Sequence, residues 1–429
     1  MLENSIRRWN PWWAEKDSVI RLSGIDRELS FHIAKALALS HIKDIIGVRR
    51  SGKTTIMYQI IKSLLNKGAM PKDIVFLNFD DPGLNESSFD DILKSIEKIN
   101  PGAKYLFIDE VQQKSGWEKW IRTLYDTRMF SQILVSGSSA SLLSQDIGRV
   151  LTGRHLTFVV FPFSFKEFLK FNGWKKFDID FLKYNKNKLL HYQDEYIKSG
   201  GFPEILKKED SEKKIILTHT YNDILSRDIC ARFGASYEII QKVSYHLLSN
   251  ISKEFSYRSV ANATGSSVET AEKYISYLKE SFLILIVDFF SYKTKIQFKQ
   301  NKKAYCIDTG LRNAASFKFS EDAGRLMENA VLIELKRRGK DVYYWKDKFG
   351  KEVDFLVKEG LKVKELIQVC WNIADAGVKK RELKGLLAAC KNFKLKRASI
   401  ITEDKEAKET VGGRKITYMP LWKWMLETR

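Results

Sequence analysis

One short segment constrains this chain more than any other. Residues 47–54 read Gly-Val-Arg-Arg-Ser-Gly-Lys-Thr, which matches the pattern G-x-x-x-x-G-K-[ST] at every fixed position. An isoleucine-rich stretch, residues 42–46, leads into this segment, and a helix-like pattern follows over residues 55–65. In a strand–loop–helix order, the loop N–H groups and the positive end of the helix point at an anion. The segment therefore predicts a loop that binds nucleotide phosphates.

The fixed residues of this loop have separate expected roles. Gly47 and Gly52 allow the backbone turn that directs successive N–H groups at the phosphates. Lys53 is expected to reach the β- and γ-phosphate oxygens, and the Thr54 hydroxyl to ligate Mg²⁺. The other expected phosphate contacts are Arg49, Arg50, Ser51 and Thr55. ATP and Mg²⁺ are the expected cofactors, and the motif does not distinguish ATP from GTP.

A second, acidic motif indicates hydrolysis as well as binding. Residues 105–110 read Tyr-Leu-Phe-Ile-Asp-Glu, an apolar run that ends in two carboxylates, as buried parallel strands do. We expect Asp109 to hold Mg²⁺ and Glu110 to orient the attacking water. The alternative is a strand that ends in two solvated acids. A third apolar run, residues 133–138, ends in serines, of which Ser136 or Ser138 either senses the γ-phosphate or belongs to a plain turn.

Further short stretches place the chain among known proteins. They are NPWW at residues 10–13, LTGR at 151–154, FPFSFKEF at 161–168, GGFPE at 200–204 and DTGL at 308–311. With the two motifs above, the chain resembles the AAA+ branch of the P-loop ATPases, and more narrowly the prokaryotic, mainly archaeal, ATPases with a C-terminal nuclease-like domain. The resemblance implies that Arg154 is an arginine finger acting on a neighbouring subunit of a homo-oligomer. The alternative for Arg154 is a structural pair with a surface acid.

The patterns and the resemblance together predict the domain organisation. The expected parts are a Trp-rich arm at 1–20, an AAA+ ATPase domain at 21–160, a helical lid or linker at 161–235, a winged-helix domain at 236–315 and a PD-(D/E)XK nuclease-like domain at 316–429. Strands alternate with helical patterns in the ATPase part, so the fold class is α/β with a parallel sheet covered by helices on both faces. Trp9, Trp12 and Trp13 are expected to fasten the arm to the ATPase domain.

Composition excludes several other classes of protein. The apolar content of 44% is enough for several cores across 429 residues. No apolar run approaches the roughly 20 residues of a membrane helix, so no membrane is expected as a partner. The four cysteines are widely spaced, which predicts neither a zinc site nor a disulfide framework. A cytoplasmic protein is expected.

Charge is distributed unevenly along the chain. Of the formal net charge of +20, residues 1–155 carry +4 and residues 156–429 carry +16. A polyanion, DNA bound largely without sequence preference, is the expected partner of the more basic part. The alternative is a solvated, lysine-rich surface.

Residues 240–290 predict a helix–turn–helix. A first helix at 258–264, a turn at Gly265 and a second helix from Ser266 or Ser267 to Ser281 fit the pattern. On the second helix, the residues expected in the core are Val268, Ala271, Ile275 and Leu278.

A strand and a basic loop follow as a wing would. The lysines expected to contact phosphates there are Lys293, Lys295, Lys299, Lys302 and Lys303. Glu269 and Glu272 disfavour a recognition helix that reads sequence. A winged helix that binds protein is the alternative.

Residues 320–429 resemble the nuclease-like fold. Glu328 lies on a helical segment, and Asp354 matches the family's metal-binding acid. Gln368 and Cys370 stand where an active site would have Glu-x-Lys. The doubtful site is therefore Glu328, Asp354 and Gln368, with cleavage weak or absent. The alternative is an active enzyme in which a cation from residues 379–381 has replaced the missing lysine.

These expectations combine into one functional hypothesis. The chain is expected to bind and hydrolyse ATP and to act on or near DNA. The alternative is a nucleotide-dependent switch or scaffold that hydrolyses slowly and assembles protein partners.

Overall fold

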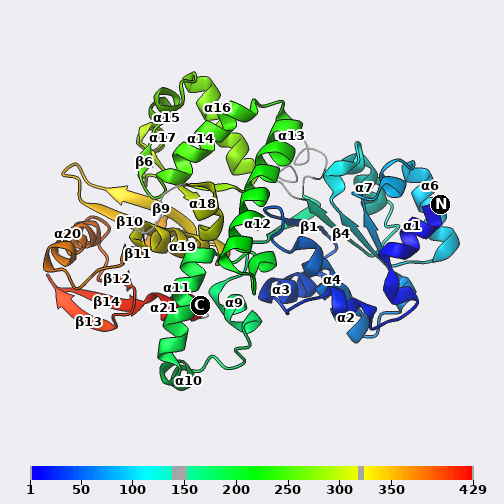
Figure 1. Ribbon diagram of the computed structural model, residues 1–429, viewed down its shortest axis with the longest axis horizontal. Coiled ribbons are helices and arrows are strands. Elements are labelled where there is room, and N and C mark those ends of the chain that lie inside the picture. Colours follow the sequence, from blue (N-terminus) through cyan, green and yellow to red (C-terminus); the bar gives the residue numbers. More distant parts are fainter. Residues whose placement is uncertain (1, 138–150, 152, 317–322, 428–429) are drawn as a thin grey trace. The chain divides into compact units, whose positions relative to one another are not determined.

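The chain forms two compact units, Met1–Phe161 and Pro162–Arg429. A computed structural model describes residues 2–137, 151, 153–316 and 323–427 (Figure 1). Among these described residues, no helix has both the length and the apolar composition that crossing a membrane requires.

The first unit is built on a parallel sheet. Its strands are β1 (Ile42–Ile46), β2 (Ile74–Asn78), β3 (Tyr105–Asp109), β4 (Gln132–Gly137) and β5 (His155–Val159), in the order β2-β3-β4-β1-β5. All neighbouring pairs are parallel. The predicted α/β class with a parallel sheet is therefore confirmed. Because parallel strands end at the same edge, the phosphate loop after β1 and the acids at the end of β3 lie at one edge.

Helices surround this sheet. They are α1 (Leu2–Trp9), η1 (Pro11–Trp13), α2 (Ser18–Leu22), α3 (Glu28–Ala36), α4 (Lys53–Asn66), η2 (Pro71–Asp73), α5 (Pro82–Asn85), α6 (Phe89–Ile99), η3 (Val111–Gln113) and α7 (Trp117–Asp126). Buried apolar residues of α2, α3 and α4 pack with Ile45, Phe76 and Phe107 of the strands in one core. The buried residues of α4 thus hold against the sheet the helix that begins in the phosphate loop.

The Trp-rich segment packs into the first unit, as the sequence predicted. The Trp12 side chain is fully buried in the core, and Trp13 Nε1 donates to Ile74 O at 2.8 Å. Asn10, only 1% exposed, pairs with the edge strand β2 in both directions: its Nδ2 donates to Phe76 O at 2.8 Å, and its Oδ1 accepts from Phe76 N at 2.7 Å. The Asn10 amide therefore takes the place of a neighbouring strand at one position of the sheet edge.

The second unit begins with helices and continues into a small antiparallel sheet. The first helices are α9 (Phe165–Phe171), α10 (Ile179–Tyr184), α11 (Lys186–Ser199), η5 (Pro203–Ile205), α12 (Asp210–Asp223), the π-helical η6 (Ile224–Cys230) and α13 (Ala231–Phe233). There follow α14 (Tyr237–Ser249), β6 (Glu254–Phe255), α15 (Tyr257–Thr264), α16 (Val268–Glu280), β7 (Ile284–Asp288), α17 (Thr294–Lys299), β8 (Lys302–Cys306) and α18 (Thr309–Ala315). The sheet order is β6-β8-β7.

Details of α15 and α16 agree with the predicted helix–turn–helix. Gly265 ends α15 in the left-handed conformation, and the Ser267 side chain caps α16 by accepting from Thr270 N. One core residue was wrong: Val268 is 43% exposed, because it is the first residue of α16 and precedes the buried face. The expected basic loop is also partly helical, since it contains α17.

The C-terminal part of this unit contains a six-stranded mixed sheet. Its elements are α19 (Ala323–Arg337), β9 (Asp341–Lys346), β10 (Glu352–Glu359), β11 (Lys362–Cys370), α20 (Ala376–Asn392), β12 (Arg397–Thr402), β13 (Ala407–Val411), β14 (Arg414–Pro420) and α21 (Leu421–Leu426). The strand order is β13-β14-β12-β11-β10-β9. Buried residues of α20 pack against β10, β11 and β12 in a core of their own.

Three of the short stretches noted in the sequence meet inside the second unit. Asp308, which is buried, accepts hydrogen bonds from the backbone N–H groups of Gly201 at 2.7 Å and Leu311 at 2.9 Å. A Cβ atom on Gly201 would lie 2.3 Å from Phe163 O, and one on Gly310 would lie 1.8 Å from Ser199 O. Glycine is therefore required where these backbones touch.

We expect Asn10→Ala to destabilise the first unit by about 1–3 kcal/mol, because the buried N–H and C=O of Phe76 lose their partners. The measurement is chemical unfolding of the full chain followed by circular dichroism. Asn66→Ala, at an exposed position on α4, is the matched control and should change stability by less than about 0.5 kcal/mol. Equal stability of the two variants would contradict the role given to Asn10.

Candidate functional site

The phosphate loop joins β1 to α4 through backbone that only some residues tolerate. Gly47 has φ 151°, Arg50 has φ 65°, and Gly52, the residue that caps α4, has φ 95°. A Cβ atom on Gly47 would lie 2.3 Å from Val160 O. The loop is therefore a tight turn whose first glycine is fixed by contact with the segment after β5.

Lys53 lies folded against the loop from the first turn of α4. Its side chain is buried, and Nζ donates to Gly47 O at 3.1 Å and to Val48 O at 3.3 Å. Of the other expected contacts, Ser51 is buried, Arg50 is exposed, and Arg49 and Thr55 are half-buried. The Ser51 Oγ atom has no hydrogen-bond partner among the described residues. A polar atom left this way in a tight loop fits a site for a polar ligand.

Arg27, which was not predicted from the sequence, lies outside the phosphate loop and donates a hydrogen bond to its backbone. It is buried, and its guanidinium donates to Ser51 O at 2.9 Å and to Phe161 O at 2.9 Å. No sequence pattern singles it out, because both partners are distant backbone carbonyls. Arg27 therefore positions the loop.

Asp109, at the end of β3, meets two hydroxyls. Thr54 Oγ1 donates to Asp109 Oδ2 at 2.6 Å, and Ser136 Oγ donates to Asp109 Oδ1. Burial, with the charge of Glu110, raises the pKa of Asp109 to about 6, although Ser136, Thr54 and Lys53 oppose the shift. The structure thus brings together the loop hydroxyl and the acid that the sequence proposed as Mg²⁺ ligands.

Glu110 follows in a strained conformation. Its φ is 52°, which is unusual for a residue with a side chain. Its backbone N–H donates to Ser136 Oγ at 3.5 Å, and its carboxylate accepts from Gln112 Nε2. Glu110 therefore turns away from the direction of β3 instead of continuing the strand. Ser138 lies outside the described residues.

Arg154 lies at the opposite edge of the sheet from the phosphate loop. Its backbone oxygen accepts from Ile42 N at 2.8 Å, at the start of β1, whereas the loop follows the end of β1. Its Nε donates to Asp126 Oδ1 at 2.9 Å. Within one chain, the guanidinium is paired and directed away from its own nucleotide site.

The second expected site contains a cation that the sequence analysis placed elsewhere. Lys303 Nζ lies 2.5 Å from Glu352 Oε1, 3.5 Å from Glu328 Oε1 and 3.8 Å from Asp354 Oδ1. The Lys303 side chain is only 3% exposed. The expectation that Lys303 contacts phosphate from an exposed wing was therefore wrong, because β8 directs it inward to three carboxylates.

The charges of this cluster interact mainly with one another, because the Lys303 ammonium lies among the three carboxylates. Burial lowers the pKa of Lys303, but the charges of Glu328, Asp354 and Glu352 outweigh it, so the net shift is upward. Tyr305 OH donates to Glu328 Oε1 at 2.7 Å. Across the described ranges, no three His, Cys, Asp or Glu side chains converge in a way that would hold a metal ion. The lysine occupies the place between the acids.

Gln368 lies next to this cluster without joining it. Its Nε2 donates to Glu382 Oε2 at 2.6 Å, and its Oε1 accepts from Asp354 N at 3.3 Å. Of the three cations at residues 379–381 that the sequence offered in place of the expected lysine, Arg381 pairs with Glu382, Lys379 pairs with Glu409, and Lys380 is exposed.

The sequence analysis missed three residues of this region: Lys303, Glu352 and Glu382. Glu352 had a signal, since it precedes Asp354 by two positions on one strand and therefore shares its face.

Known protein families match the fold and the site described for the first unit. Residues 40–169 match the family model described as AAA domain. Residues 190–322 and 323–424 match two domains of unknown function, DUF8612 and DUF4143. The first unit is thus an AAA-type P-loop ATPase domain, with a nucleotide-binding fold.

Relatives extend the comparison to most of the chain. "Uncharacterized protein MJ1544" of Methanocaldococcus jannaschii is 38% identical over 407 residues, which cover 90% of this chain and 88% of the relative. An "Uncharacterized protein" of Haemophilus influenzae is 30% identical, over 89% of this chain and 94% of the relative. The solved Walker-type ATPase PABY2304 of Pyrococcus abyssi gives a TM-score of 0.44 at 12% identity, over 68% of this chain and 95% of that one. The chain belongs to the family of AAA-domain proteins that includes MJ1544.

The raised pKa of Asp109 predicts a stability penalty with a defined pH window. The Asp109 carboxyl ionises near its ordinary pKa of 3.8 in the unfolded chain but only near pH 6 in the folded chain. The stability penalty is therefore absent below about pH 4, where both forms are protonated, and complete above about pH 6. Without divalent cations, Asp109→Asn is therefore expected to raise stability at pH 7.5 by up to about 3 kcal/mol, and by much less at pH 4. Thermal unfolding at the two pH values measures this difference. A variant that is less stable than the native chain at pH 7.5 would refute it.

Proposed function

We propose that this protein hydrolyses ATP in its first unit and binds DNA through its second. The observation that carries the ATPase assignment is the hydrogen bond of Thr54 to Asp109 beside the buried ammonium of Lys53. A hydroxyl and a carboxylate are hard oxygen ligands, and Mg²⁺ usually takes only one or two from protein when it is bound with phosphates. The residues present therefore fit Mg²⁺ and a nucleoside triphosphate.

Each residue of this site then has one role. Lys53, Arg49 and Arg50 would neutralise phosphate charge, and the loop N–H groups, Ser51 and Thr55 would donate hydrogen bonds to the phosphate oxygens. Thr54 and Asp109 would hold Mg²⁺, which would offset charge on the β- and γ-phosphates. Glu110 orients water, and its turned backbone supports this role because it carries the carboxylate out of the strand. The paired Arg154, at the far edge of its own sheet, acts as an arginine finger on a neighbouring copy in a homo-oligomer.

The second unit is proposed to contain three parts. Residues 161–235 form a helical lid or linker. Residues 236–315 form a winged helix, supported by the order α14-β6-α15-α16-β7-α17-β8 and the three-stranded sheet. Residues 316–429 form a PD-(D/E)XK nuclease-like domain, supported by α19, the strands β9–β11, and α20 leading to β12 parallel with β11. Residues 1–20 and 21–160 are the arm and the ATPase domain of the first unit.

DNA is proposed as the partner because of where the charge lies. Residues 156–429 carry +16 of the total of +20. Lysines and arginines that contact phosphates release counterions, so such binding is strong at low salt and largely independent of sequence.

The nuclease-like domain is proposed to be catalytically silent. A metal in this fold needs the oxygens of Glu328 and Asp354, but Lys303 already neutralises both and is itself buried between them. A metal ion that took these oxygens would leave the buried ammonium of Lys303 without its acidic partners, which costs free energy. The domain therefore binds DNA without cutting it.

Two variants separate nucleotide binding from hydrolysis. Lys53→Ala should lose ATP binding, whereas Glu110→Gln should bind ATP and hydrolyse it at least about a hundredfold more slowly. ATP turnover is measured with and without single-stranded, duplex and branched DNA. DNA should stimulate the native chain and leave Lys53→Ala inactive. Full turnover by Glu110→Gln would remove its assignment. Indifference of the native ATPase to DNA would favour a nucleotide-dependent switch that assembles protein partners.

The internal lysine predicts a gain of metal binding when it is removed. In an Asp109→Asn background, the protein should bind Mn²⁺ poorly, and Lys303→Ala should bind it at least about tenfold more tightly, because the carboxylates that now face Lys303 are then free to turn toward another cation. Lys303→Arg, which keeps a cation, is the matched control and should not gain affinity. Calorimetry with Mn²⁺ alone gives the readout. DNA cleavage by the native chain that disappears in Asp354→Ala would overturn the silent assignment.

A further inference from the structure

Three segments of the second unit, residues 291–300, 346–351 and 391–397, are rich in exposed cations. We call them together the basic surface. Its nine exposed cations are Lys293, Lys295, Lys299, Lys348, Lys351, Lys391, Lys394, Lys396 and Arg397. Within the described part of the chain, none of the nine forms an ion pair, whereas neighbouring Lys346 pairs with Glu254 and Lys302 with Asp288. The charge of the nine is therefore directed to solvent.

These segments contain almost no acid to balance that charge. The one acidic residue in them is Asp347, and its Oδ1 accepts from the backbone N–H groups of Phe349 and Lys351 at 2.8 and 2.9 Å. Asp347 thus shapes the turn between β9 and β10. A partner that meets this surface has to bring negative charge of its own.

Aromatic contacts join the three segments. The Tyr292 ring lies 6.4 Å from that of Phe393, and Phe393 lies 5.7 Å from Trp345, which precedes the β9–β10 turn. Gln300, at the end of α17, lines a cavity of about 320 Å³ with Tyr344 and Lys348. The segments are distant in sequence but adjacent in the fold.

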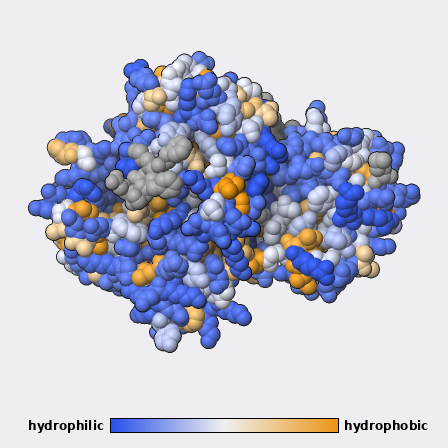
Figure 2. All heavy atoms as spheres, viewed as in Figure 1, coloured by the Kyte–Doolittle hydropathy of each residue, from blue (hydrophilic) through white to orange (hydrophobic). Residues whose placement is uncertain are grey.

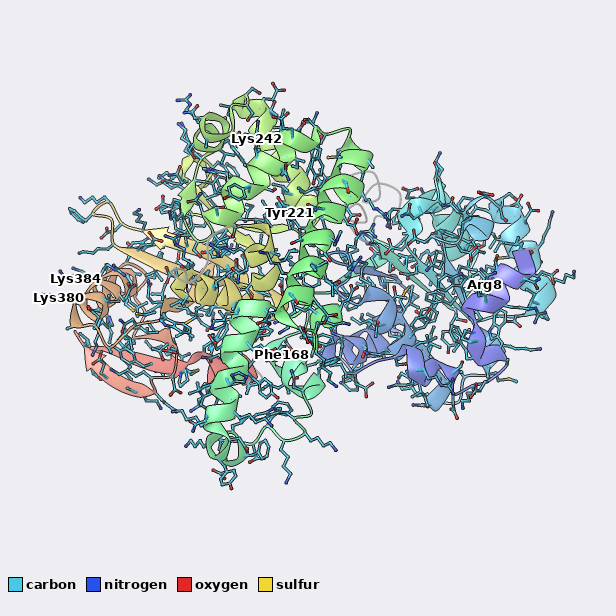
Figure 3. All side chains as sticks on the ribbon, in the orientation of Figure 1. Arg8, Phe168, Tyr221, Lys242, Lys380 and Lys384 are labelled. Atoms are coloured by element: carbon cyan, nitrogen blue, oxygen red, sulfur yellow. The ribbon has the colours of Figure 1, made fainter. Side chains whose placement is uncertain are left out.

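Exposed lysines of α20 extend the surface. Lys380 and Lys384 lie one helical turn apart on α20 and project outward in Figure 3. Figure 1 shows α20 and the β9–β10 turn on the same side of this unit. Lys391 follows seven positions after Lys384, so it belongs to the same helix face and continues this row of lysines toward residues 391–397.

The basic surface also exposes aromatic rings. Phe298 is 77% exposed, Phe349 is 74% exposed and Tyr292 is 69% exposed. Lys348 and Lys351 lie 5.0 and 5.8 Å from the centre of the Phe349 ring. Hydrophilic residues predominate on the face that Figure 2 shows. Separate rings set among cations suit flat aromatic groups joined by negative charges.

We infer that the basic surface binds single-stranded DNA, with unpaired bases stacked on Phe298 and Phe349 and phosphates on the surrounding lysines. Base stacking needs free base faces, which a duplex does not offer, whereas lysine contacts to phosphate serve both forms. This inference rests on the proposed DNA partner and adds its location and its strandedness. The two features together, rings and unpaired cations, favour a nucleic acid over an anionic membrane, since exposed Lys299 and Lys348 adjoin Phe298 and Phe349, whereas insertion requires a continuous apolar face.

The test measures fluorescence anisotropy of the full chain with a labelled oligothymidine of about 30 nucleotides and with a duplex of the same length. Phe298→Ala/Phe349→Ala should weaken oligothymidine binding about tenfold or more and leave duplex binding within about twofold. Replacing Lys295, Lys299, Lys391 and Lys394 by Gln should weaken both and reduce the salt slope for the oligothymidine by about 3.

Matched controls come from residues 170–184 of the same unit, where exposed lysines alternate with Asp178 and Asp180. Replacing Lys170, Lys175, Lys176 and Lys183 by Gln, or the 91% exposed Tyr184 by Ala, should change binding less than about twofold. ATP turnover without DNA should stay at the native rate in all variants and shows that the chain is folded.

The outcomes separate this inference from the proposed function. Native binding to DNA that survives both sets of changes in the basic surface, or falls equally in the controls, would overturn the location. Equal loss of duplex binding in Phe298→Ala/Phe349→Ala would overturn the strandedness. Binding of anionic vesicles without any binding of DNA would overturn the inference and the proposed partner together.

Discussion

Buried carboxylates set the main constraint on this fold, because an ionised acid in the interior needs partners that replace water. Asp109 accepts hydrogen bonds from two hydroxyls, but burial and the charge of Glu110 outweigh them and raise its pKa to about 6. Asp308 accepts hydrogen bonds from the backbone N–H groups of Gly201 and Leu311 and so joins two segments that are distant in sequence. Asp354 shares the ammonium of Lys303. The three acids thus differ in the groups that replace water: hydroxyls for Asp109, backbone N–H groups for Asp308 and an ammonium for Asp354.

The sequence predicted the elements whose signals are local. Three strands of the first sheet, β1, β3 and β4, the phosphate loop and the acids at the end of β3 follow from short patterns, and the structure places Thr54 against Asp109. Arg27 and Lys303 were not predicted in their positions, since their partners lie far away in sequence. For Lys303 the surrounding lysines suggested a basic loop that contacts phosphates, and only the pairing of β8 with its neighbours determines that this side chain points inward.

The stretches GGFPE and DTGL, which are two of those that carry the family resemblance, have a structural explanation. Gly201 and Gly310 lie where backbone atoms of other segments would be about 2 Å from any Cβ, and Asp308 ties the two stretches together. A sequence pattern can therefore be specific because of close packing and not because of chemistry. Conversely, the proposed DNA contacts lie in segments with no recognisable motif, because phosphate binding requires charge and exposure but no fixed spacing.

Asn10 has a consequence for how copies of this protein can associate. The edge of a sheet ordinarily invites another strand, and chains with open edges tend to join by extending their sheets. At β2, the amide of Asn10 already occupies both hydrogen-bonding groups of Phe76, and Trp13 takes the oxygen of Ile74. Strand pairing between copies at the β2 edge is therefore blocked. Contacts between copies at this edge have to be made by side chains.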